Sequence, residues 1–326
     1  MFIGKCRRTA IVALAVAATT LTLGTAAAQS NVDRLRAEVQ ANPGSVVAWV
    51  ALGNALYQGG QYDDAKTAFL EAIALDYRSG DAHYGLGLAE FARGDYQAAL
   101  FEFTEVTRLH PDRFDGHFNR GVTLARLRRS QDAAAAFREA LRRKPGYALV
   151  HNNYGIALAR AGRLDEALTH HKTACELEPR SAAIRYNLGA LLMRLGRSAE
   201  ALPELQQTVG LDPAHAGAHA ALAEIHCSQG RLDEALEHRR AVVKTQPKSA
   251  SARHLLAVDL AAAGRLDDAA AEYREAIRLD AGHVDARFGL AALLRKQGKL
   301  DEALAQYEAA LAIQTGDGAG AGLAPQ

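Results

Sequence analysis

The sequence contains few of the residues that build a core from large aromatic side chains. Aromatic residues make up 6% of the chain, with a single tryptophan among its 326 residues, and there are only eight prolines. Alanine and leucine are abundant instead, a mix typical of helices that cross closely through small side chains. The composition therefore predicts an all-α fold of closely packed helices.

The motifs of common catalytic and cofactor sites are also absent. The sequence has no glycine-rich phosphate loop, no GxSxG elbow, no HExxH and no CxxC. Its many carboxylates recur with the repeat described below, and no pair stands apart as a catalytic candidate. We therefore expect a protein that is not an enzyme and that uses no cofactor and no metal.

The first 28 residues differ in character from the rest of the chain. They open with three basic residues, Lys5, Arg7 and Arg8. A mostly apolar and uncharged stretch follows at 11–23, and the alanines at 26–28 supply the small residues after which a signal peptide is cleaved. We expect a signal peptide over 1–28, a mature chain that starts at Gln29, and a secreted or periplasmic protein.

Two alternatives for this segment stay open. An uncleaved anchor is disfavoured, because the apolar stretch is short and rich in alanine and threonine. The adjacent Arg7 and Arg8 allow export by the twin-arginine route, although two neighbouring basic residues are common in leaders.

Neither sign of charge predominates in the chain. It holds 38 lysines and arginines against 37 aspartates and glutamates, and removal of the three basic leader residues leaves 35 against 37. A net charge of −2 gives no support for nucleic acid or an anionic membrane surface as the partner. After cleavage we expect no stable membrane span.

Cysteine is scarce as well. Beyond the leader only Cys175 and Cys227 remain, and they fall two repeats apart in the register given below. A disulfide needs α-carbons within about 7 Å of each other. We therefore expect two free, buried thiols.

The main signal is a motif of 34 residues that recurs eight times without an insertion. Leu-Gly or a variant marks each copy, at Leu52-Gly53, Leu86-Gly87, Arg120-Gly121, Tyr154-Gly155, Leu188-Gly189, Leu222-Ala223, Leu256-Ala257 and Leu290-Ala291. Sixteen residues after the glycine or alanine stands Phe69, Phe103, Phe137, His171, Leu205, Arg239, Tyr273 or Tyr307. The units span 46–79, 80–113, 114–147, 148–181, 182–215, 216–249, 250–283 and 284–317.

Each recurring residue has a mechanical role in a pair of helices. Small residues allow the two helices to cross closely, and the bulky residue fills the space beside them. Glycines such as Gly60 allow the left-handed turn after the first helix, and aspartates such as Asp165 cap free amides at the start of the second. Proline ends the second helix at Pro111 and its equivalents, whereas Pro203 falls inside one and predicts a mild kink.

This pattern resembles the tetratricopeptide repeat over about residues 46–317. The resemblance implies a right-handed superhelical solenoid of helix-turn-helix units with a concave groove lined by the first helices. We expect a lead helix at 29–45 before the first repeat and a flexible tail at 318–326. The last helix, with Ala305, Ala309 and Ala312 facing out, is a candidate surface for self-association.

Three rows of residues on the first helices form the candidate peptide-binding groove. An asparagine row comprises Asn119, Asn153 and Asn187, and an arginine row comprises Arg126, Arg160 and Arg194. A partly aromatic row comprises Tyr84, Phe118, Asn152 and Tyr186. Asparagine offers a donor and an acceptor that match an extended backbone, and arginine favours an acidic side chain or a C-terminal carboxylate. The rows are similar to the asparagine ladders and carboxylate clamps of the family.

The alternative is that these residues are common at their repeat positions for reasons of helix starting and solubility. A third row, His83, His117, His151 and His219, is spaced too widely for one metal ion and predicts a partly exposed packing position. The leading hypothesis is an adaptor that holds an extended segment of another protein in its groove. The alternative function is a structural module that associates through its C-terminal repeat.

Overall fold

The computed structural model describes residues 24–315, and the chain divides after Pro179 into two compact units. All regular secondary structure in this range is α-helical, as predicted. None of its helices combines the length and hydropathy that a membrane crossing requires. The predicted tail and the leader up to residue 23 lie outside the described residues, and the first helix begins at Gly24.

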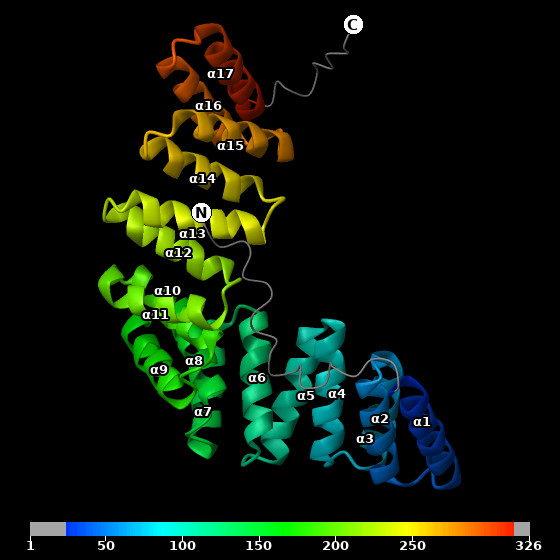
Figure 1. Ribbon diagram of the computed structural model, residues 1–326. Coiled ribbons are helices and arrows are strands. Elements are labelled where there is room, and N and C mark those ends of the chain that lie inside the picture. Colours follow the sequence, from blue (N-terminus) through cyan, green and yellow to red (C-terminus); the bar gives the residue numbers. More distant parts are fainter. Residues whose placement is uncertain (1–23, 316–326) are drawn as a thin grey trace, which may run out of the picture. The chain divides into compact units, whose positions relative to one another are not determined.

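The first unit is a row of helices packed in chain order, each against the next (Figure 1). The helix α1 precedes four helix pairs. The helices are α1 (Gly24–Ala41), α2 (Val46–Gln58), α3 (Tyr62–Leu75), α4 (Gly80–Arg93), α5 (Tyr96–Leu109), α6 (Phe114–Arg126), α7 (Ser130–Arg143), α8 (Ala148–Arg160) and α9 (Leu164–Leu177). First helices also meet across repeats, since α2 contacts α4 and α6 contacts α8.

The second unit repeats the same arrangement over four further pairs (Figure 1). Its helices are α10 (Ala182–Arg194), α11 (Ser198–Leu211), α12 (Ala216–Ser228), α13 (Leu232–Thr245), α14 (Ala250–Ala262), α15 (Leu266–Leu279), α16 (Val284–Lys296) and α17 (Leu300–Thr315). Pro203 lies inside α11, as the repeat register predicts. The fold is an all-α repeat solenoid.

The turn between the two helices of a repeat uses a residue in the left-handed conformation. Seven of the eight turns place a glycine there, with φ between 72° and 86°. The turn after α6 is different, because Arg128 takes this conformation with φ 60°. A side chain in this region crowds the following carbonyl, so the seven glycines lower the cost of the turn and Arg128 does not.

The two helices of a repeat cross where a glycine meets a ring. A Cβ added at Gly121 would lie 2.7 Å from Cδ1 of Phe137, and one at Gly87 would lie 2.8 Å from Cε1 of Phe103. The phenylalanine rings are fully buried, so no space remains for a larger residue on the facing helix. This confirms the role predicted for the small and bulky positions.

The aspartates at the start of the second helices do not act as predicted. At α9, α13 and α15 the N-cap residue is an arginine without a side-chain capping bond, and Asp165 and its equivalents lie in the first turn. There a carboxylate complements the helix dipole instead of accepting a capping bond. The reason is positional, because the turn glycine sets the N-cap two residues before the aspartate.

The two thiols are free, but only one is buried. Cys175 is buried in α9, whereas Cys227 on α12 is partly exposed. Burial and the nearby Asp259 carboxylate raise the pKa of the Cys227 thiol to about 11. A thiol with such a pKa carries almost no thiolate at neutral pH and is a poor nucleophile.

Candidate functional site

The predicted groove residues are divided between the two units. Tyr84, Phe118, Asn119, Arg126, Asn152, Asn153 and Arg160 lie on α4, α6 and α8 of the first unit. Tyr186, Asn187 and Arg194 lie on α10 of the second. The site is therefore built on the neighbouring first helices of the first unit.

The amide of Asn119 is engaged within the protein. Its side chain is 9% exposed, and its Nδ2 donates to the Tyr84 hydroxyl at 3.0 Å and to the Asp115 carbonyl at 3.1 Å. The bond to Tyr84 joins α6 to α4, and the bond to Asp115 lies within α6. Both donors of Asn119 are therefore occupied, and the prediction that this residue offers its amide group to a ligand is wrong for the donors.

Asn153 is the equivalent residue one repeat later, and its amide differs from that of Asn119 in its hydrogen bonding. Its side chain is half-buried and makes no hydrogen bond within the described part of the chain. The asparagine row of the first unit therefore offers one open amide, on α8, instead of two.

The partly aromatic row belongs to the packing between the two helices of a repeat. The rings of Tyr84 and Phe103 lie 5.9 Å apart, and those of Phe118 and Phe137 lie 6.1 Å apart. Phe118 is 7% exposed, and Asn152 at the same repeat position is also buried. Their assignment to the groove surface was wrong, because one step along a helix turns a side chain by about 100° toward the partner helix.

Tyr84 is held both by Asn119 of the next repeat and by Arg113 at the end of its own repeat. Arg113 stands over its ring at 5.0 Å and also pairs with Asp81 and Asp115 at 2.7 Å each. Burial, with the Asp115 charge as a smaller cause, raises the pKa of Tyr84 to about 12. Tyr84 is therefore a neutral hydroxyl that accepts from Asn119.

Tyr186 of the second unit also packs within the fold. Its ring lies 4.4 Å from that of His215, and a Cβ added at Gly217 would lie 2.7 Å from its hydroxyl oxygen. Gly217 therefore provides the space that the Tyr186 side chain occupies.

An apolar row that the sequence analysis missed runs beside these positions. Leu88, Val122 and Ile156 are spaced by 34 residues on α4, α6 and α8, and each side chain is half-buried. On α8 the residues Asn153, Ile156 and Arg160 follow i, i+3, i+7 spacing and therefore share one helix face. The regular spacing was visible in the sequence and could have identified this row.

The arginines of the first unit extend the same face. The Arg126 guanidinium lies 5.9 Å from the centre of the Phe91 ring on α4, and Arg160 is exposed. Within the described residues, neither arginine pairs with a carboxylate. By contrast, Arg93 at the end of α4 is bound by Glu90 and Asp63. Arg126 and Arg160 therefore keep their donors available to an acidic group.

The residues of the histidine row bind the loops that precede their helices. The Nε2 atoms of His83, His117, His151 and His219 lie 2.8–3.1 Å from carbonyl oxygens six residues earlier, at Tyr77, Pro111, Pro145 and Pro213. The indole of Trp49 makes the equivalent bond to Pro43 at 2.9 Å. Since His83, His117 and His219 are buried, the row is a structural linkage and not the partly exposed position predicted.

Two of these histidines also face a second histidine. The Nδ1 atoms of His151 and His170 lie 3.0 Å apart, and those of His219 and His238 lie 2.9 Å apart. When both rings are neutral, one Nδ1 of such a pair carries a proton and donates it to the other, which accepts. Burial, with His219 and His226 as smaller causes, lowers the pKa of His238 to about 4. Over residues 24–315, no group of three His, Cys, Asp or Glu side chains is placed to hold a metal ion.

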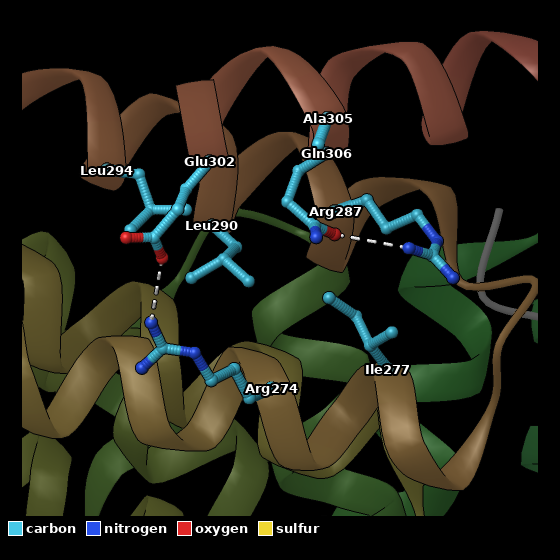
Figure 2. Close-up of a pocket in the computed structure, with 8 residues that line it drawn as sticks. All are labelled: Arg274, Ile277, Arg287, Leu290, Leu294, Glu302, Ala305 and Gln306. Carbon is cyan, nitrogen blue, oxygen red and sulfur yellow. Dashed lines mark hydrogen bonds and ion pairs between the residues drawn. The ribbon is translucent and has the colours of Figure 1, made fainter. Parts of the chain in front are cut away.

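A surface hollow in the second unit is a product of repeat packing. It lies between α15, α16 and α17, where Arg274 pairs with Glu302 at 3.8 Å and Arg287 donates to Gln306 at 3.1 Å (Figure 2). A second hollow occurs one repeat earlier, and seven of its eight lining residues stand at equivalent positions. Because the feature recurs with the repeat and its charges are paired within the chain, it gives no sign of a specific ligand site.

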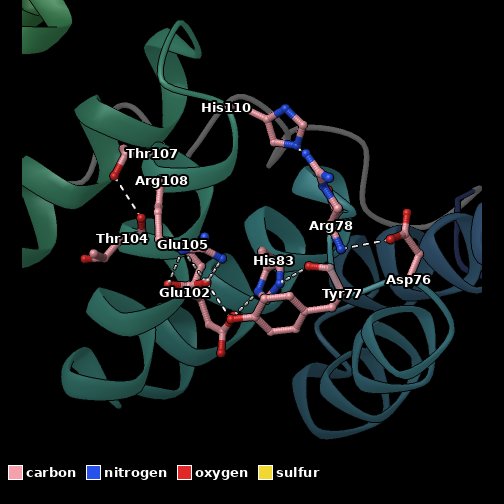
Figure 3. Close-up of polar contacts among 10 residues, drawn as sticks. All are labelled: Asp76, Tyr77, Arg78, His83, Glu102, Thr104, Glu105, Thr107, Arg108 and His110. Carbon is pink, nitrogen blue, oxygen red and sulfur yellow. Dashed lines mark hydrogen bonds and ion pairs between the residues drawn. The ribbon is translucent and has the colours of Figure 1, made fainter.

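A polar cluster in the first unit joins a loop to α5. The Tyr77 hydroxyl donates to Glu105 at 2.5 Å, and Arg108 pairs with the same carboxylate at 2.8 Å (Figure 3). His83 contacts Glu102 at 2.6 Å and the Tyr77 carbonyl at 2.9 Å. Burial lowers the pKa of His83, but the bonds to Glu102 and Tyr77 outweigh it and raise the pKa overall. The cluster stabilises the loop before α4.

Solved structures with the same fold are found in bacteria and in larger assemblies. The chain is 23% identical to YrrB, a TPR protein with an unusual peptide-binding site, with a TM-score of 0.53, covering 57% of this chain and 96% of YrrB. It is 21% identical to pilF of Pseudomonas aeruginosa, with a TM-score of 0.56, and the match covers 64% of this chain and 95% of the pilF chain. It is 15% identical to a chain of the APC/C hetero-tetramer Cut9–Hcn1, with a TM-score of 0.52, and the match covers 87% of this chain and 56% of that one. These likenesses show the fold alone.

Family comparisons identify the repeat itself. A comparison with curated proteins found no match. A family model described as tetratricopeptide repeat matches residues 50–114, 102–148, 186–250 and 254–318. A second, described as TPR repeat, matches 157–196. These matches cover more than half of the chain, which therefore belongs to the tetratricopeptide repeat family, whose members are protein–protein interaction scaffolds and are generally not enzymes.

Proposed function

We propose that the chain holds an extended segment of another protein across α4, α6 and α8. The observation that carries this proposal is the alignment of two rows on these helices. The half-buried Leu88, Val122 and Ile156 form an apolar strip, and Arg126 and Arg160 stand next to it without a carboxylate partner in the described chain. We call this face the groove strip.

The dimensions of the groove strip fit an extended peptide. Packed helices lie about 10 Å apart, and an extended chain rises about 3.3 Å per residue, so about three ligand residues would pass each helix. Apolar ligand side chains would cover the strip, and acidic ones would bind the two guanidinium groups. The open amide of Asn153 offers a donor and an acceptor to the ligand backbone.

The setting of the protein is a further part of the proposal. The leader expected at 1–28 would deliver the mature chain to the periplasm, where its partner would be found. YrrB, which has the same fold, is described as having a peptide-binding site, and this agrees with peptide capture by the chain.

A capture experiment with matched charge changes tests the groove strip. The mature chain is used to capture proteins from envelope extract beside the double variant Arg126→Glu, Arg160→Glu. The control is Arg138→Glu, Lys172→Glu, which reverses two exposed basic residues on the second helices α7 and α9. We expect the groove variant to lose a partner that the control retains. Equal capture by all three proteins would refute the proposal.

A second candidate function, self-association, is favoured by the surface of α17. Leu304 is 56% exposed, whereas Leu168 and Leu236 at the same repeat position are 7% and 1% exposed. Leu300 and Leu311 on α17 are also more than half exposed. Ala305 is exposed, as predicted, and Ala309 and Ala312 are half-buried. The exposed leucines, which the sequence analysis did not name, add a larger apolar surface to α17. Sedimentation of the wild type and Leu304→Glu tests this function: a dimer that the variant loses supports it, and a monomer at high concentration refutes it.

A further inference from the structure

The positive charge of the chain is concentrated in one segment. Residues 113–163 contain eleven lysines and arginines but only three acidic residues, whereas the rest of the chain contains 27 basic and 34 acidic residues. This segment spans α6, α7 and α8 in the first unit. A chain that is nearly neutral overall therefore carries a strongly basic region across its third and fourth repeats.

The basic residues gather at two turns in particular. Arg126, Arg128 and Arg129 stand at the turn after α6, and Arg160 and Arg163 stand at the turn after α8. The two turns are equivalent, and α6 contacts α8, so they lie at the same end of neighbouring first helices. We call these five residues the arginine edge.

Three of the five have no acidic partner. Arg129 pairs with Asp132 at 2.8 Å, and Arg163 pairs with Glu166 through Nε at 2.6 Å. Within residues 24–315 no carboxylate pairs with Arg126, Arg128 or Arg160. Unpaired guanidinium groups at neighbouring turns repel one another, so an anionic ligand would relieve this repulsion.

Arg128 also has an unfavourable backbone conformation for a residue with a side chain. Among residues 24–315 it is the one non-glycine residue with positive φ, at a turn position that holds glycine in the other seven repeats. Its side chain is exposed, and within the described part of the chain it makes no hydrogen bond or ion pair that would offset this strain. A strained residue that adds nothing to the fold is a feature of binding sites, because the surrounding structure supports it for another purpose.

We propose that the arginine edge binds an acidic segment of a partner protein. The guanidinium group binds a carboxylate through two parallel hydrogen bonds, and all five residues of the edge are arginine, not lysine. The inference deepens the proposed function, on which it rests in part, because Arg126 and Arg160 belong to both surfaces. The ligand of the groove strip therefore carries acidic residues at the end that reaches these turns.

The extent of the edge favours a short acidic peptide over a long polyanion. The preceding turn, after α4, places Asp95 beside Gly94, and its Arg93 is bound by Glu90 and Asp63. The arginine edge thus covers two turns and meets acidic residues on one side. A nucleic acid would need a basic track that follows many phosphates, together with stacking side chains.

The test uses two fluorescein-labelled peptides, one of six Glu-Ser repeats and one of six Gln-Ser repeats. Fluorescence anisotropy at about 50 and 200 mM salt should show binding of the Glu peptide alone, weakened by salt. Arg128→Gly should lower its affinity about threefold and raise the midpoint of thermal unfolding, since it removes both a charge and a strained residue. Gly162→Arg places an arginine at the equivalent turn after α8, so it should raise the affinity for the Glu peptide and lower the midpoint of thermal unfolding.

Controls separate the edge from general charge effects and from the groove. Gly298→Arg in the second unit should lower the unfolding midpoint and leave peptide affinity unchanged. If the groove experiment fails while Arg128→Gly still weakens Glu-peptide binding, the edge proposal stands alone.

Two results would overturn the proposal. Wild-type affinity of Arg128→Gly for the Glu peptide would show that the strained arginine has no role in binding. Tighter binding of a twelve-nucleotide single-stranded DNA than of the Glu peptide, at both salt concentrations, would assign the edge to nucleic acid.

Discussion

His171 makes the stability of the first unit depend on pH, and its replacement by phenylalanine should remove part of that dependence. It occupies the position of Phe137 in the preceding repeat, is 2% exposed and packs against Gly155. Its Nδ1 has no hydrogen-bond partner in the described residues. Burial, together with the neighbouring His170, lowers the pKa of His171 to about 4. His171→Phe therefore keeps a buried ring and removes a titrating group.

The magnitude follows from the difference in pKa between the folded and unfolded states. In the unfolded chain a histidine has a pKa of about 6.5, so between about pH 6.5 and 4 the unfolded state binds more protons than the folded state. The free energy of unfolding is therefore highest above pH 6.5 and falls as the pH is lowered toward 4. At pH 5.0 the loss due to His171 is about 2 kcal/mol, and it approaches about 3 kcal/mol below pH 4.

Urea unfolding followed by far-UV circular dichroism at pH 7.5 and 5.0 measures this effect. Between the two values, wild type should lose about 2 kcal/mol more stability than His171→Phe. His110→Gln, at an exposed histidine, is the control and should follow wild type. If wild type and His171→Phe lose the same stability on acidification, then the burial of His171 does not control its titration and the reasoning is wrong.

Two further predictions concern packing and charge. Gly121→Ala should destabilise the chain by about 1–3 kcal/mol in urea unfolding, because the added Cβ would lie 2.7 Å from Phe137. Gly146→Ala is the control and should have little effect, because no atom lies within 4 Å of its added Cβ. Asp259→Ala should cost about 3–5 kcal/mol by the same measurement, since it leaves Arg239, 2.6 Å away and mostly buried, without its partner. An unchanged midpoint would contradict either prediction.

The repeat register and the local geometry of each unit were predictable from the sequence because they depend on neighbouring residues. A glycine such as Gly94 can take positive φ without the steric cost of a side chain, and a proline such as Pro111 ends a helix through its own ring. Facing partners 16 residues apart, such as Gly121 and Phe137, could be paired because the connection between two helices of fixed length leaves one crossing.

The roles of polar side chains were less predictable, because they depend on residues that a repeat pattern does not specify. Arg239 replaces the bulky residue of its repeat, and its partner Asp259 lies 20 positions away on α14. No spacing rule of the repeat pairs these two positions, since the other repeats have uncharged residues where Asp259 stands. The histidine row likewise gave no sign that its rings bind the preceding loops.

The sequence by itself determined the helices, their turns and the face of each first helix on which Asn119 and Asn153 stand, because these follow from helical periodicity. Only the tertiary structure decided which of the two amides is open. Tyr84, on the first helix of the repeat before Asn119, takes its donor, whereas Asn153 has no such bond in the described chain. A side chain's position on its own helix is a local property, but its exposure depends on which residue the neighbouring repeat places opposite it.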